Sequence, residues 1–385
     1  MRRYELDWLR VFVFALLIFY HVGMFFVPWE FHIKNNIIYD WLKWPMLFVN
    51  QWRLSILFVI SGMGTYYALG KRTGIQFSKE RISRLLLPLA FGMLVIVPPQ
   101  VYFERVVQGG FTGGYLDFWP WEAFIGSYPE GNLSWHHLWF LPYLLLFSLL
   151  LAPLFVYLRK HPENVISNWI HRILSRPLLS YLLISPLFLI YYFLKPLFPV
   201  THALVGDWFS LSWYLVMFFY GFILISSKET FWKTASENRR LFLVNGLAGF
   251  TMLMLLWFVF DHFPFWPFIE AFVKTFNVWS WIMALFGYAS SYLNRNTRFL
   301  SYCNEAVYPF YILHQTIMII IGFYILDLDW SFFAKASLMV IGTFLGSLIL
   351  YVLLIKRIST LRPLFGLKPK KKASPLKKEK ILAAR

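Results

Sequence analysis

The first apolar stretch of the chain, residues 8–27, reads WLRVFVFALLIFYHVGMFFV and decides the fold. Apart from Arg10 and His21 it is almost wholly apolar, and about 18 such residues suffice to span a membrane as a helix. Arg2 and Arg3 before it imitate a secretory signal, but the run is too long for one and lacks a small-residue cleavage site. Residues 8–27 therefore predict the first spanning helix.

Comparable apolar runs recur to the far end of the chain. They fall near residues 8–28, 45–69, 83–103, 137–158, 177–195, 208–226, 241–260, 269–291, 304–326 and 332–356. The chain is 59% hydrophobic and 14% charged, whereas a soluble domain carries about 25% charged residues. The sequence predicts an all-α polytopic membrane protein with about ten transmembrane helices, in one membrane domain over residues 1–360.

The basic residues behind the net charge of +17 sit in short clusters between the apolar runs. This distribution favours membrane topology over nucleic-acid binding, because no continuous basic face forms. Most Lys and Arg residues fall on one side if the N-terminus is cytoplasmic, and the positive-inside rule then predicts both termini in the cytoplasm. Residues 361–385 predict a basic, disordered tail that anchors to anionic lipid. The single Cys303 excludes an intramolecular disulfide and a thiolate metal cluster.

Several ionisable side chains fall inside the predicted helices, where they are costly and are functional candidates. Arg10 and His21 are about three helical turns apart and point to nearly the same face. An imidazole in a dry site suits general-base work, whereas Arg10 could also snorkel as an anchor. Arg53 and His314 are candidates for binding substrate, although a packed, satisfied histidine is equally consistent with the position of His314.

Arg81 and Arg84 begin the third predicted helix with i,i+3 spacing and therefore share a helix face. Forked guanidinium groups there could bind an anionic cytosolic ligand. The alternative interpretation is that both are ordinary topology arginines. Asn304 and Glu305 are expected to cap and open the ninth helix.

The outer loop near residues 104–136 is much longer than the others and is rich in aromatic and acidic residues. Trp119 and Trp121 could stack on sugars or belong to an interfacial aromatic belt. His136 and His137 follow at the mouth of the fourth helix, and His137 is a candidate for binding substrate. Adjacent side chains diverge, so these two histidines are poorly placed for joint metal binding and no metal is expected.

The order of several short motifs resembles the acyltransferase-3 family of ten-helix membrane O-acyltransferases. The motifs are LDWLR and FYH around Arg10 and His21, RLSILFVISG in the second helix, ERISRLLLP with Arg81 and Arg84, HLWFLPYL in the fourth helix and NEAVYPFYILHQ in the ninth. The fourth- and ninth-helix stretches are more similar to the glucan-biosynthesis branch than to the O-antigen acetylases. The resemblance covers nearly the whole membrane region.

The resemblance implies transfer of an acetyl or succinyl group from cytosolic acyl-CoA, the donor, to a hydroxyl of a glycan acceptor on the far side of a bacterial-type inner membrane. In such a scheme His21 is catalytic with Arg10 as its partner, and Arg81 with Arg84 grips the donor phosphates. His21 would either deprotonate the hydroxyl or itself carry the acyl group. Helix one offers no carboxylate close to His21, so an orienting group must come from another helix.

Two other functions fit some of the same residues. Intramembrane Arg and His also line transport paths, so a transporter or flippase of an anionic glycan or lipid-linked glycan is the alternative to the enzyme. A sensor or scaffold without chemistry would use these residues for packing alone. The partners expected are acyl-CoA, the glycan acceptor and membrane lipids, with no nucleic acid.

Overall fold

The computed structural model describes residues 3–260 and 263–369, and within these ranges the chain is helical with no β-strand. The first half forms α1 (Tyr4–Met24), α2 (Lys43–Asn50), α3 (Arg53–Leu69), α4 (Gly74–Arg81), α5 (Leu87–Phe91), α6 (Pro98–Val107), α7 (Tyr115–Phe118) and α8 (Phe140–Lys160). The second half forms α9 (Val165–Leu174), α10 (Ile184–Leu194), α11 (Trp208–Ser226), α12 (Lys228–Glu237), α13 (Arg239–Phe258), α14 (Trp266–Tyr292), α15 (Arg298–Ile325) and α16 (Phe332–Leu350).

Wider π-helical turns join some of these helices into longer rods. The turns Ile82–Leu86 and Gly92–Ile96 link α4, α5 and α6, and the turn Tyr351–Ile355 extends α16. Such turns are uncommon and frequently occur at functional sites. The turn Ile82–Leu86 contains Arg84, one of the two arginines that the sequence singles out.

Eight helical segments of the described chain are long and apolar enough to cross a membrane. They are Tyr4–Met24, Asp40–Leu69, Gly74–Val107, His136–Lys160, Trp208–Ser226, Arg239–Phe258, Arg298–Ile325 and Phe332–Ile355. Of the two other predicted spans, 177–195 forms the shorter apolar helix Leu179–Leu194, and 269–291 lies in the 27-residue α14, which carries Glu270 and Lys274. The all-α polytopic membrane fold is confirmed.

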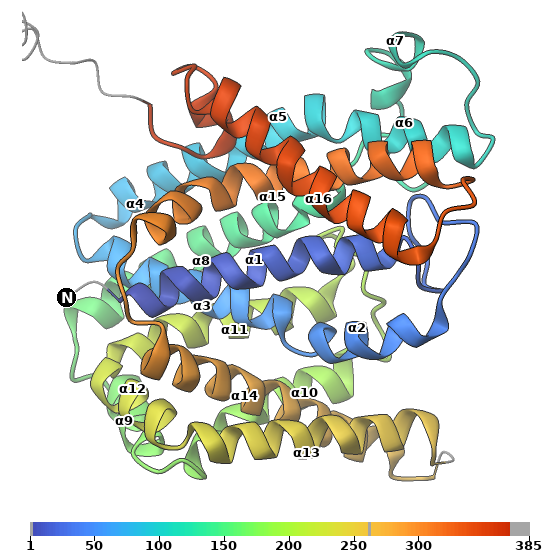
Figure 1. The fold of residues 1–385 in the computed structure, drawn as a ribbon. Coiled ribbons are helices and arrows are strands. Elements are labelled where there is room, and N and C mark those ends of the chain that lie inside the picture. Colours follow the sequence, from blue (N-terminus) through green and yellow to red (C-terminus); the bar gives the residue numbers. More distant parts are fainter. Residues whose placement is uncertain (1–2, 261–262, 370–385) are drawn as a thin grey trace, which may run out of the picture.

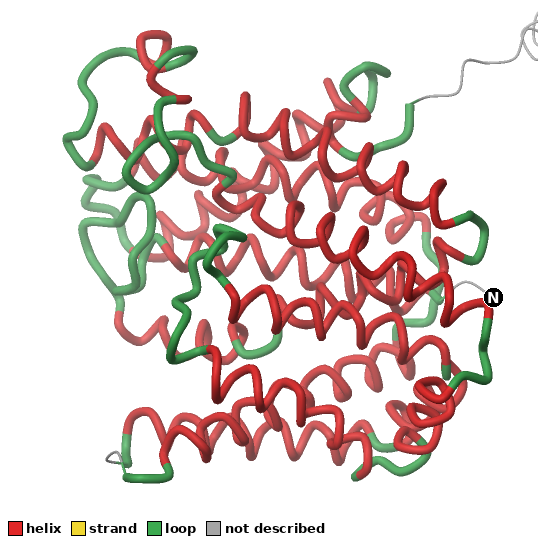
Figure 2. The backbone as a smooth tube through the Cα atoms, turned by 180° about the vertical axis from the view of Figure 1, so that it is seen from behind, coloured by secondary structure: helices red, strands yellow, loops and turns green. Residues whose placement is uncertain are grey.

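The long helices run roughly parallel, with α1 in the middle of the view (Figure 1). Helix α1 packs against α3, α14, α15 and α16, and α3 packs against α8 and α11. Helices α10, α13 and α14 form a layer along one side, seen at the bottom of the view (Figure 1). The view from behind shows the loops gathered at the two ends of this bundle (Figure 2).

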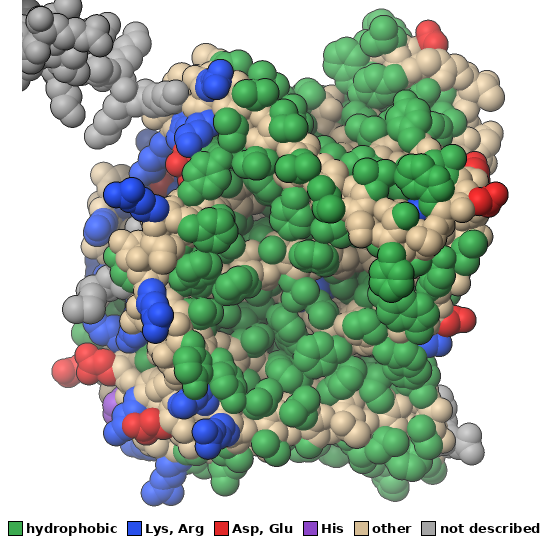
Figure 3. All heavy atoms as spheres, in the orientation of Figure 1, with side chains coloured by type: hydrophobic (Ala, Val, Ile, Leu, Met, Phe, Trp, Pro, Cys, Tyr) green, Lys and Arg blue, Asp and Glu red, His purple; other side chains and the backbone are tan. Residues whose placement is uncertain are grey.

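The surface divides into an apolar belt between two polar ends. Figure 3 shows hydrophobic side chains across the middle of one face, with Lys and Arg gathered at the end where the chain begins. Exposed apolar side chains in the belt include Phe12, Leu94, Ile341, Leu345 and Ile349. An exposed apolar band flanked by charge is the surface that a bilayer requires. We call the end rich in Lys and Arg the basic end.

The central packing of α3 against α11 depends on two glycines. A Cβ on Gly62 would lie 2.0 Å from the backbone oxygen of Phe218, and a Cβ on Gly221 would lie 2.0 Å from that of Val59. Small residues at such crossings let two helix backbones approach closely inside a membrane. The crossing holds α3, which begins at Arg53, directly against α11.

Two sequence predictions near the chain ends need correction. Residues 362–365 do not begin a disordered tail but form a short 3₁₀ turn, in which Phe365 is buried and Arg362 donates to Glu305 at 2.9 Å. The basic composition of the tail concealed this apolar turn. Helix α15 begins at Arg298 and is capped by Thr297, so Asn304 and Glu305 lie within the helix and do not open it. The remaining tail, residues 370–385, lies outside the described residues.

Replacing Gly62 by alanine should destabilise the protein, because a methyl group has no room against the α11 backbone. Overpacking of this kind costs about 1–3 kcal/mol. The matched control is Gly64→Ala on the same helix, where the nearest atom to the new Cβ is an Arg10 nitrogen 3.9 Å away. Thermal unfolding in detergent should show a lower Tm for Gly62→Ala alone; equal Tm values would contradict the tight crossing.

Candidate active site

Two histidines from distant parts of the chain meet in the interior of the bundle. His21 Nδ1 on α1 lies 2.8 Å from His314 Nε2 on α15. The two imidazole rings are nearly parallel, with an interplanar angle of 5° and ring centroids 5.0 Å apart. His314 is fully buried. An imidazole pair of this kind inside a membrane is costly unless each polar atom has a partner.

The partners of His314 determine which nitrogen carries each proton. His314 Nδ1 lies 2.8 Å from the carbonyl oxygen of Tyr311 and 3.2 Å from that of Phe310. A carbonyl only accepts, so Nδ1 of His314 carries the proton and Nε2 of the neutral ring accepts. His21 Nδ1–H must then donate to His314 Nε2. The lone pair of neutral His21 is therefore on Nε2, the atom that a general base needs.

A third histidine supports the pair from the loop before α8. The His137 ring is perpendicular to that of His314, with centroids 5.1 Å apart. His137 Nε2 donates to the carbonyl of Ile312 at 3.1 Å, and Tyr311 donates its hydroxyl to the carbonyl of His137 at 2.7 Å. These bonds tie the start of the fourth span to the middle of α15. His137 is thereby fixed beside the histidine pair.

His21 lines a cavity of about 210 Å³, which we call the histidine cavity. Its polar and aromatic walls include Tyr20, Arg53, His137, Trp139, His202 and Tyr311. The Arg53 guanidinium lies 3.5 Å from the centre of the Tyr20 ring and donates to Asn50 at 3.3 Å. Its Nε is buried without a hydrogen-bond partner in the described part of the chain. The cavity thus combines a basic nitrogen, a cation with an unused donor and flat aromatic surfaces.

His202 reaches this cavity from the loop before α11. Its ring stacks on Trp139 with centroids 3.8 Å apart and an interplanar angle of 3°. Its backbone N–H donates to Asp207 at 2.9 Å, and Tyr143 donates to the same carboxylate oxygen at 2.6 Å. Burial lowers the pKa of His202 to about 4, against the opposing effect of Asp207. His202 is therefore neutral at physiological pH and presents a flat ring to the cavity.

A second cavity, of about 310 Å³, lies towards the basic end and contains four arginines, Arg10, Arg72, Arg81 and Arg84. We call it the arginine cavity. Arg10 donates to Asn304 at 3.1 Å and lies 3.5 Å from Asp7. Arg81 donates to Thr65 at 3.2 Å. With only Glu80 among its lining acidic residues, this cavity is suited to an anion.

Glu80 organises two of these arginines. Its carboxylate lies 2.9 Å from Arg72 and 3.6 Å from Arg84. Arg84 is half exposed, with 50% of its side chain accessible, so its guanidinium remains within reach of a ligand in the cavity. The i,i+3 spacing of Arg81 and Arg84 places both on the same cavity wall.

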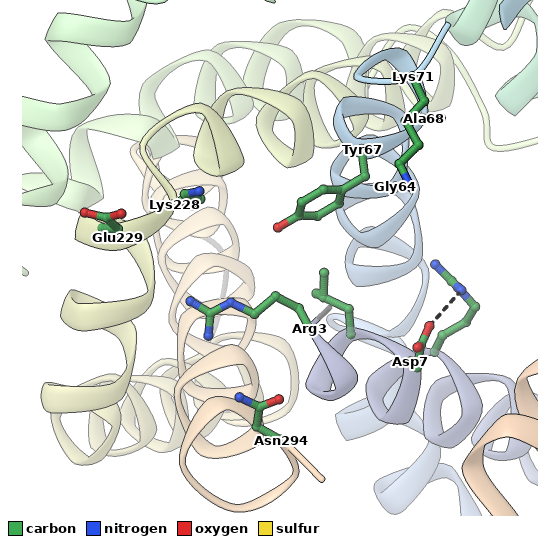
Figure 4. A pocket seen from close by; sticks show the side chains of 11 residues that line it. Arg3, Asp7, Gly64, Tyr67, Ala68, Lys71, Lys228, Glu229 and Asn294 are labelled. Carbon is green, nitrogen blue, oxygen red and sulfur yellow. Dashed lines mark ion pairs between the residues drawn. The ribbon is translucent and has the colours of Figure 1, made fainter. Parts of the chain in front are cut away.

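The cavities follow one another from the basic end to His21, and neighbouring cavities share lining residues. A wide opening of about 950 Å³ at the basic end is lined by Arg3, Lys71 and Lys228 among others (Figure 4). It shares Arg10, Gly64 and Ala68 with the arginine cavity. The arginine and histidine cavities share three aromatic residues, Phe14, Phe140 and Tyr311.

The structure divides the residues predicted from sequence between these two chambers. His21, Arg53 and His137 line the histidine cavity, and His314 contacts His21 and His137 without lining it. Arg10, Arg81 and Arg84 line the arginine cavity.

The resemblance implied that Arg10 is the partner of His21, but the structure does not bring the two side chains together. Arg10 bonds Asn304 one chamber away, because three helical turns along α1 separate the two side chains.

Trp119 and Trp121 line neither cavity, and their role in binding substrate stays a prediction. Trp119 donates to the Leu94 carbonyl at 3.0 Å, and Trp121 is 75% exposed. The long loop folds over α6, so its tryptophans cover the outer surface of the bundle and do not reach the histidine cavity.

Sequence reasoning missed Tyr20, Trp139, His202 and Tyr311 as cavity residues. Tyr20 and Trp139 stand in motifs that the sequence offered, next to His21 and after His137. His202 is the exception, since it comes from a loop with no motif. Its backbone φ of +56° is unusual for a non-glycine residue, but that signal exists only in the structure.

Comparison with known proteins places the chain beside membrane enzymes. A family model described as an acyltransferase domain matches residues 3–352. Glucans biosynthesis protein C of Escherichia coli K12 is 26% identical over 166 residues, which are 42% of this chain and 41% of the relative. The same protein from strain O1:K1 / APEC matches to the same extent. The chain thus spans about two fifths of the length of these relatives. No solved structure matches.

The hydrogen bonds around His314 predict the proton positions in the histidine pair. In ¹⁵N-histidine-labelled protein near neutral pH, His21 should show a protonated Nδ1 and an unprotonated Nε2. The nine histidines are resolved by subtracting the spectrum of His21→Ala. A protonated Nε2 on neutral His21 would contradict the arrangement, because Nδ1 would then face the His314 lone pair without a hydrogen.

Proposed function

This chain belongs to the acyltransferase-3 family of membrane acyltransferases, and we propose that it transfers an acetyl or succinyl group from cytosolic acyl-CoA to a hydroxyl of a cell-envelope glycan. The observation that carries the proposal is the geometry of the His21–His314 pair. It leaves a basic nitrogen on a residue that lines a cavity in the membrane interior. A thioester and a hydroxyl can react at such an atom with water largely excluded.

The acyl transfer follows from the lone pair on His21 Nε2. His21 accepts the proton of the acceptor hydroxyl while the hydroxyl oxygen bonds to the thioester carbonyl carbon. The carbon–sulfur bond then breaks, and the thiolate takes the proton from His21. The products are an ester on the glycan and free CoA. During the reaction His314 accepts from the charged ring of His21, and a charge-assisted hydrogen bond of this kind is stronger than the neutral one.

We assign to Arg53 the stabilisation of the negative charge that develops on the thioester carbonyl oxygen during acyl transfer. Its buried Nε has no hydrogen-bond partner among the described residues, and the side chain lines the histidine cavity with His21. A cationic donor held in a dry cavity stabilises a developing oxyanion far better than water does. The stacked rings of Trp139 and His202 on the same wall are suited to the apolar face of a sugar.

The arginine cavity is the site that we assign to the CoA phosphates. Arg81 and Arg84 would provide forked, charge-assisted hydrogen bonds to phosphate, and Arg10 would contribute from α1. The donor would enter by the wide opening at the basic end, and its thioester would pass between Phe14, Phe140 and Tyr311 to reach His21. The positive-inside rule supports a cytoplasmic location for the basic end, and we propose a bacterial inner membrane as the host.

The acceptor class draws on the relatives. These relatives are named for glucan biosynthesis, and we propose that this chain likewise uses a glycan as its acceptor. The acceptor would approach from the end opposite the arginine cavity, because the histidine cavity is walled there by residues of the outer loops, Phe31 and His202. Donor and acceptor would thus meet at His21 from opposite sides of the membrane.

Purified full-length protein should release free CoA from acetyl-CoA or succinyl-CoA in the presence of cell-envelope glycans, as measured by thiol detection. Replacing His21 by alanine should lower kcat by about 10²- to 10⁴-fold, the usual contribution of a general base. The matched control is His161→Ala, an exposed histidine at the end of α8, which should retain the wild-type rate. Wild-type turnover in a folded His21→Ala protein would disprove the role of His21.

Arg81→Ala should weaken acyl-CoA binding while the bound donor still reacts. Loss of one charge-assisted hydrogen bond to phosphate costs about 1.5–3 kcal/mol, so KM for acyl-CoA should rise about 10- to 100-fold with a smaller change in kcat. Arg176→Ala, an exposed arginine that lines neither cavity, is the control. If Arg81→Ala changes kcat alone, the arginine cavity does not hold the donor.

A further inference from the structure

A cluster of two histidines and a glutamate lies outside both cavities, at the end of the molecule opposite the basic end. His32 comes from the loop after α1, Glu104 from α6 and His136 from the turn before α8. One ligand atom from each residue lies within 4.8 Å of the other two. His32 Nδ1 is 2.5 Å from Glu104 Oε2, and His136 Nε2 is 3.8 Å from the same oxygen.

The other polar atoms of two of these residues are already bonded. Tyr128 donates its hydroxyl to Glu104 Oε1 at 2.9 Å, which leaves Oε2 to face the histidines. His136 Nδ1 lies 2.8 Å from Ser134 Oγ, and Ser134 Oγ also accepts the backbone N–H of His136 at 2.9 Å. A proton on Nδ1 donated to Ser134 leaves the lone pair of His136 on Nε2. Outer contacts that orient ligand atoms in this way are a general feature of metal sites.

His136 is not explained by hydrogen bonding within the protein. Its Nε2 is buried and has no hydrogen-bond partner among the residues that the structure describes, since 3.8 Å to Glu104 is too long for a hydrogen bond. The side chain is 1% exposed. The backbone of His136 has a φ of +38°, which costs free energy for a residue other than glycine. The chain therefore holds a buried imidazole nitrogen 3.8 Å from a carboxylate oxygen, on a backbone in a strained conformation.

We propose that His32, Glu104 and His136 bind one Zn²⁺ ion or a similar divalent transition metal. Two imidazoles and one carboxylate suit Zn²⁺, whereas Mg²⁺ and Ca²⁺ prefer oxygen ligands throughout. The ion takes the place of the proton that His32 Nδ1 and Glu104 share, and the three ligand atoms adjust to lie about 2.0–2.2 Å from the ion. The fourth position is filled by water or a ligand oxygen.

The metal joins three segments that otherwise meet only through side chains. It fixes the loop after α1 and the turn before α8 to α6, and Arg105, the residue after Glu104, donates to the carbonyls of Pro129 and Gly131 in the same loop at 2.7 Å. His136 precedes His137, so the ion sets the position of the residue that supports the histidine pair. Phe31, next to His32, also lies against His21, with ring centroids 6.5 Å apart.

The sequence led us to expect no metal, because the side chains of the adjacent His136 and His137 should diverge. In the structure the two side chains do point to different partners. His137 donates to the carbonyl of Ile312, whereas His136 faces Glu104. The ligands that complete the site come from α6 and from the loop after α1, which spacing along the chain could not reveal.

The test measures metal bound to full-length protein in detergent. Protein stripped with a chelator is dialysed against a small excess of Zn²⁺, and bound zinc is quantified by mass spectrometry together with the Tm. Wild type should hold about one zinc per chain and show a higher Tm with zinc than without. His32→Ala and His136→Ala should each lose the zinc and the zinc-dependent Tm shift, while the exposed-histidine control His161→Ala should keep both.

Two results would overturn the proposal. Wild-type protein without stoichiometric zinc would show that the cluster is a hydrogen-bonded group only, and retention of zinc by folded His32→Ala or His136→Ala would place the ion elsewhere. If both variants fail to fold, the zinc content and the zinc-dependent Tm shift of the wild type decide whether the site exists. Glu104→Gln is then the third variant to be measured. Binding is measured without acyl donor, so the outcome is independent of the acyltransferase assay.

Discussion

The interior of this protein depends on one hydrogen bond, from His21 Nδ1–H on α1 to His314 Nε2 on α15. Leaving a polar group without a partner in hydrocarbon costs several kcal/mol, so neither helix can present its histidine unless the other helix is in register. The carbonyls of Phe310 and Tyr311 fix the proton on His314, and His314 in turn fixes the proton on His21. A structural requirement of the membrane interior therefore also creates the basic atom that acyl transfer needs.

The same requirement separates the charges of the protein by depth. Arginines that would bind CoA phosphates gather near the basic end, where Glu80, Asn304 and Asp7 provide partners. The histidine cavity has a single cation, Arg53, packed on Tyr20. Three aromatic side chains lie where the two chambers adjoin. The boundary between the two cavities is therefore aromatic, and it separates the four arginines of one cavity from the histidines of the other.

The outer loops complete this arrangement from the opposite end. His202 stacks on Trp139, and His137 is held between Gln100, Ile312 and Tyr311. In the cluster of His32, Glu104 and His136, His136 directly precedes His137 in the chain and His32 lies beside Phe31. Loops therefore position the outer wall of the histidine cavity, while the packed helices, brought together by contacts such as Gly62 against α11, position His21 and His314.

The amino-acid sequence by itself determined the helical membrane fold and the asymmetry of positive charge, and it was enough to single out His21, Arg81 and Arg84 as candidates. Hydrophobicity and charge act locally along a helix, so they can be read from neighbouring residues. Only the tertiary structure decided that His21 pairs with His314, 293 residues away, that Arg10 serves the other chamber, and that Glu104 meets His32 and His136. Such contacts depend on how helices pack and how loops cross their ends, and no short-range pattern along the chain encodes that packing.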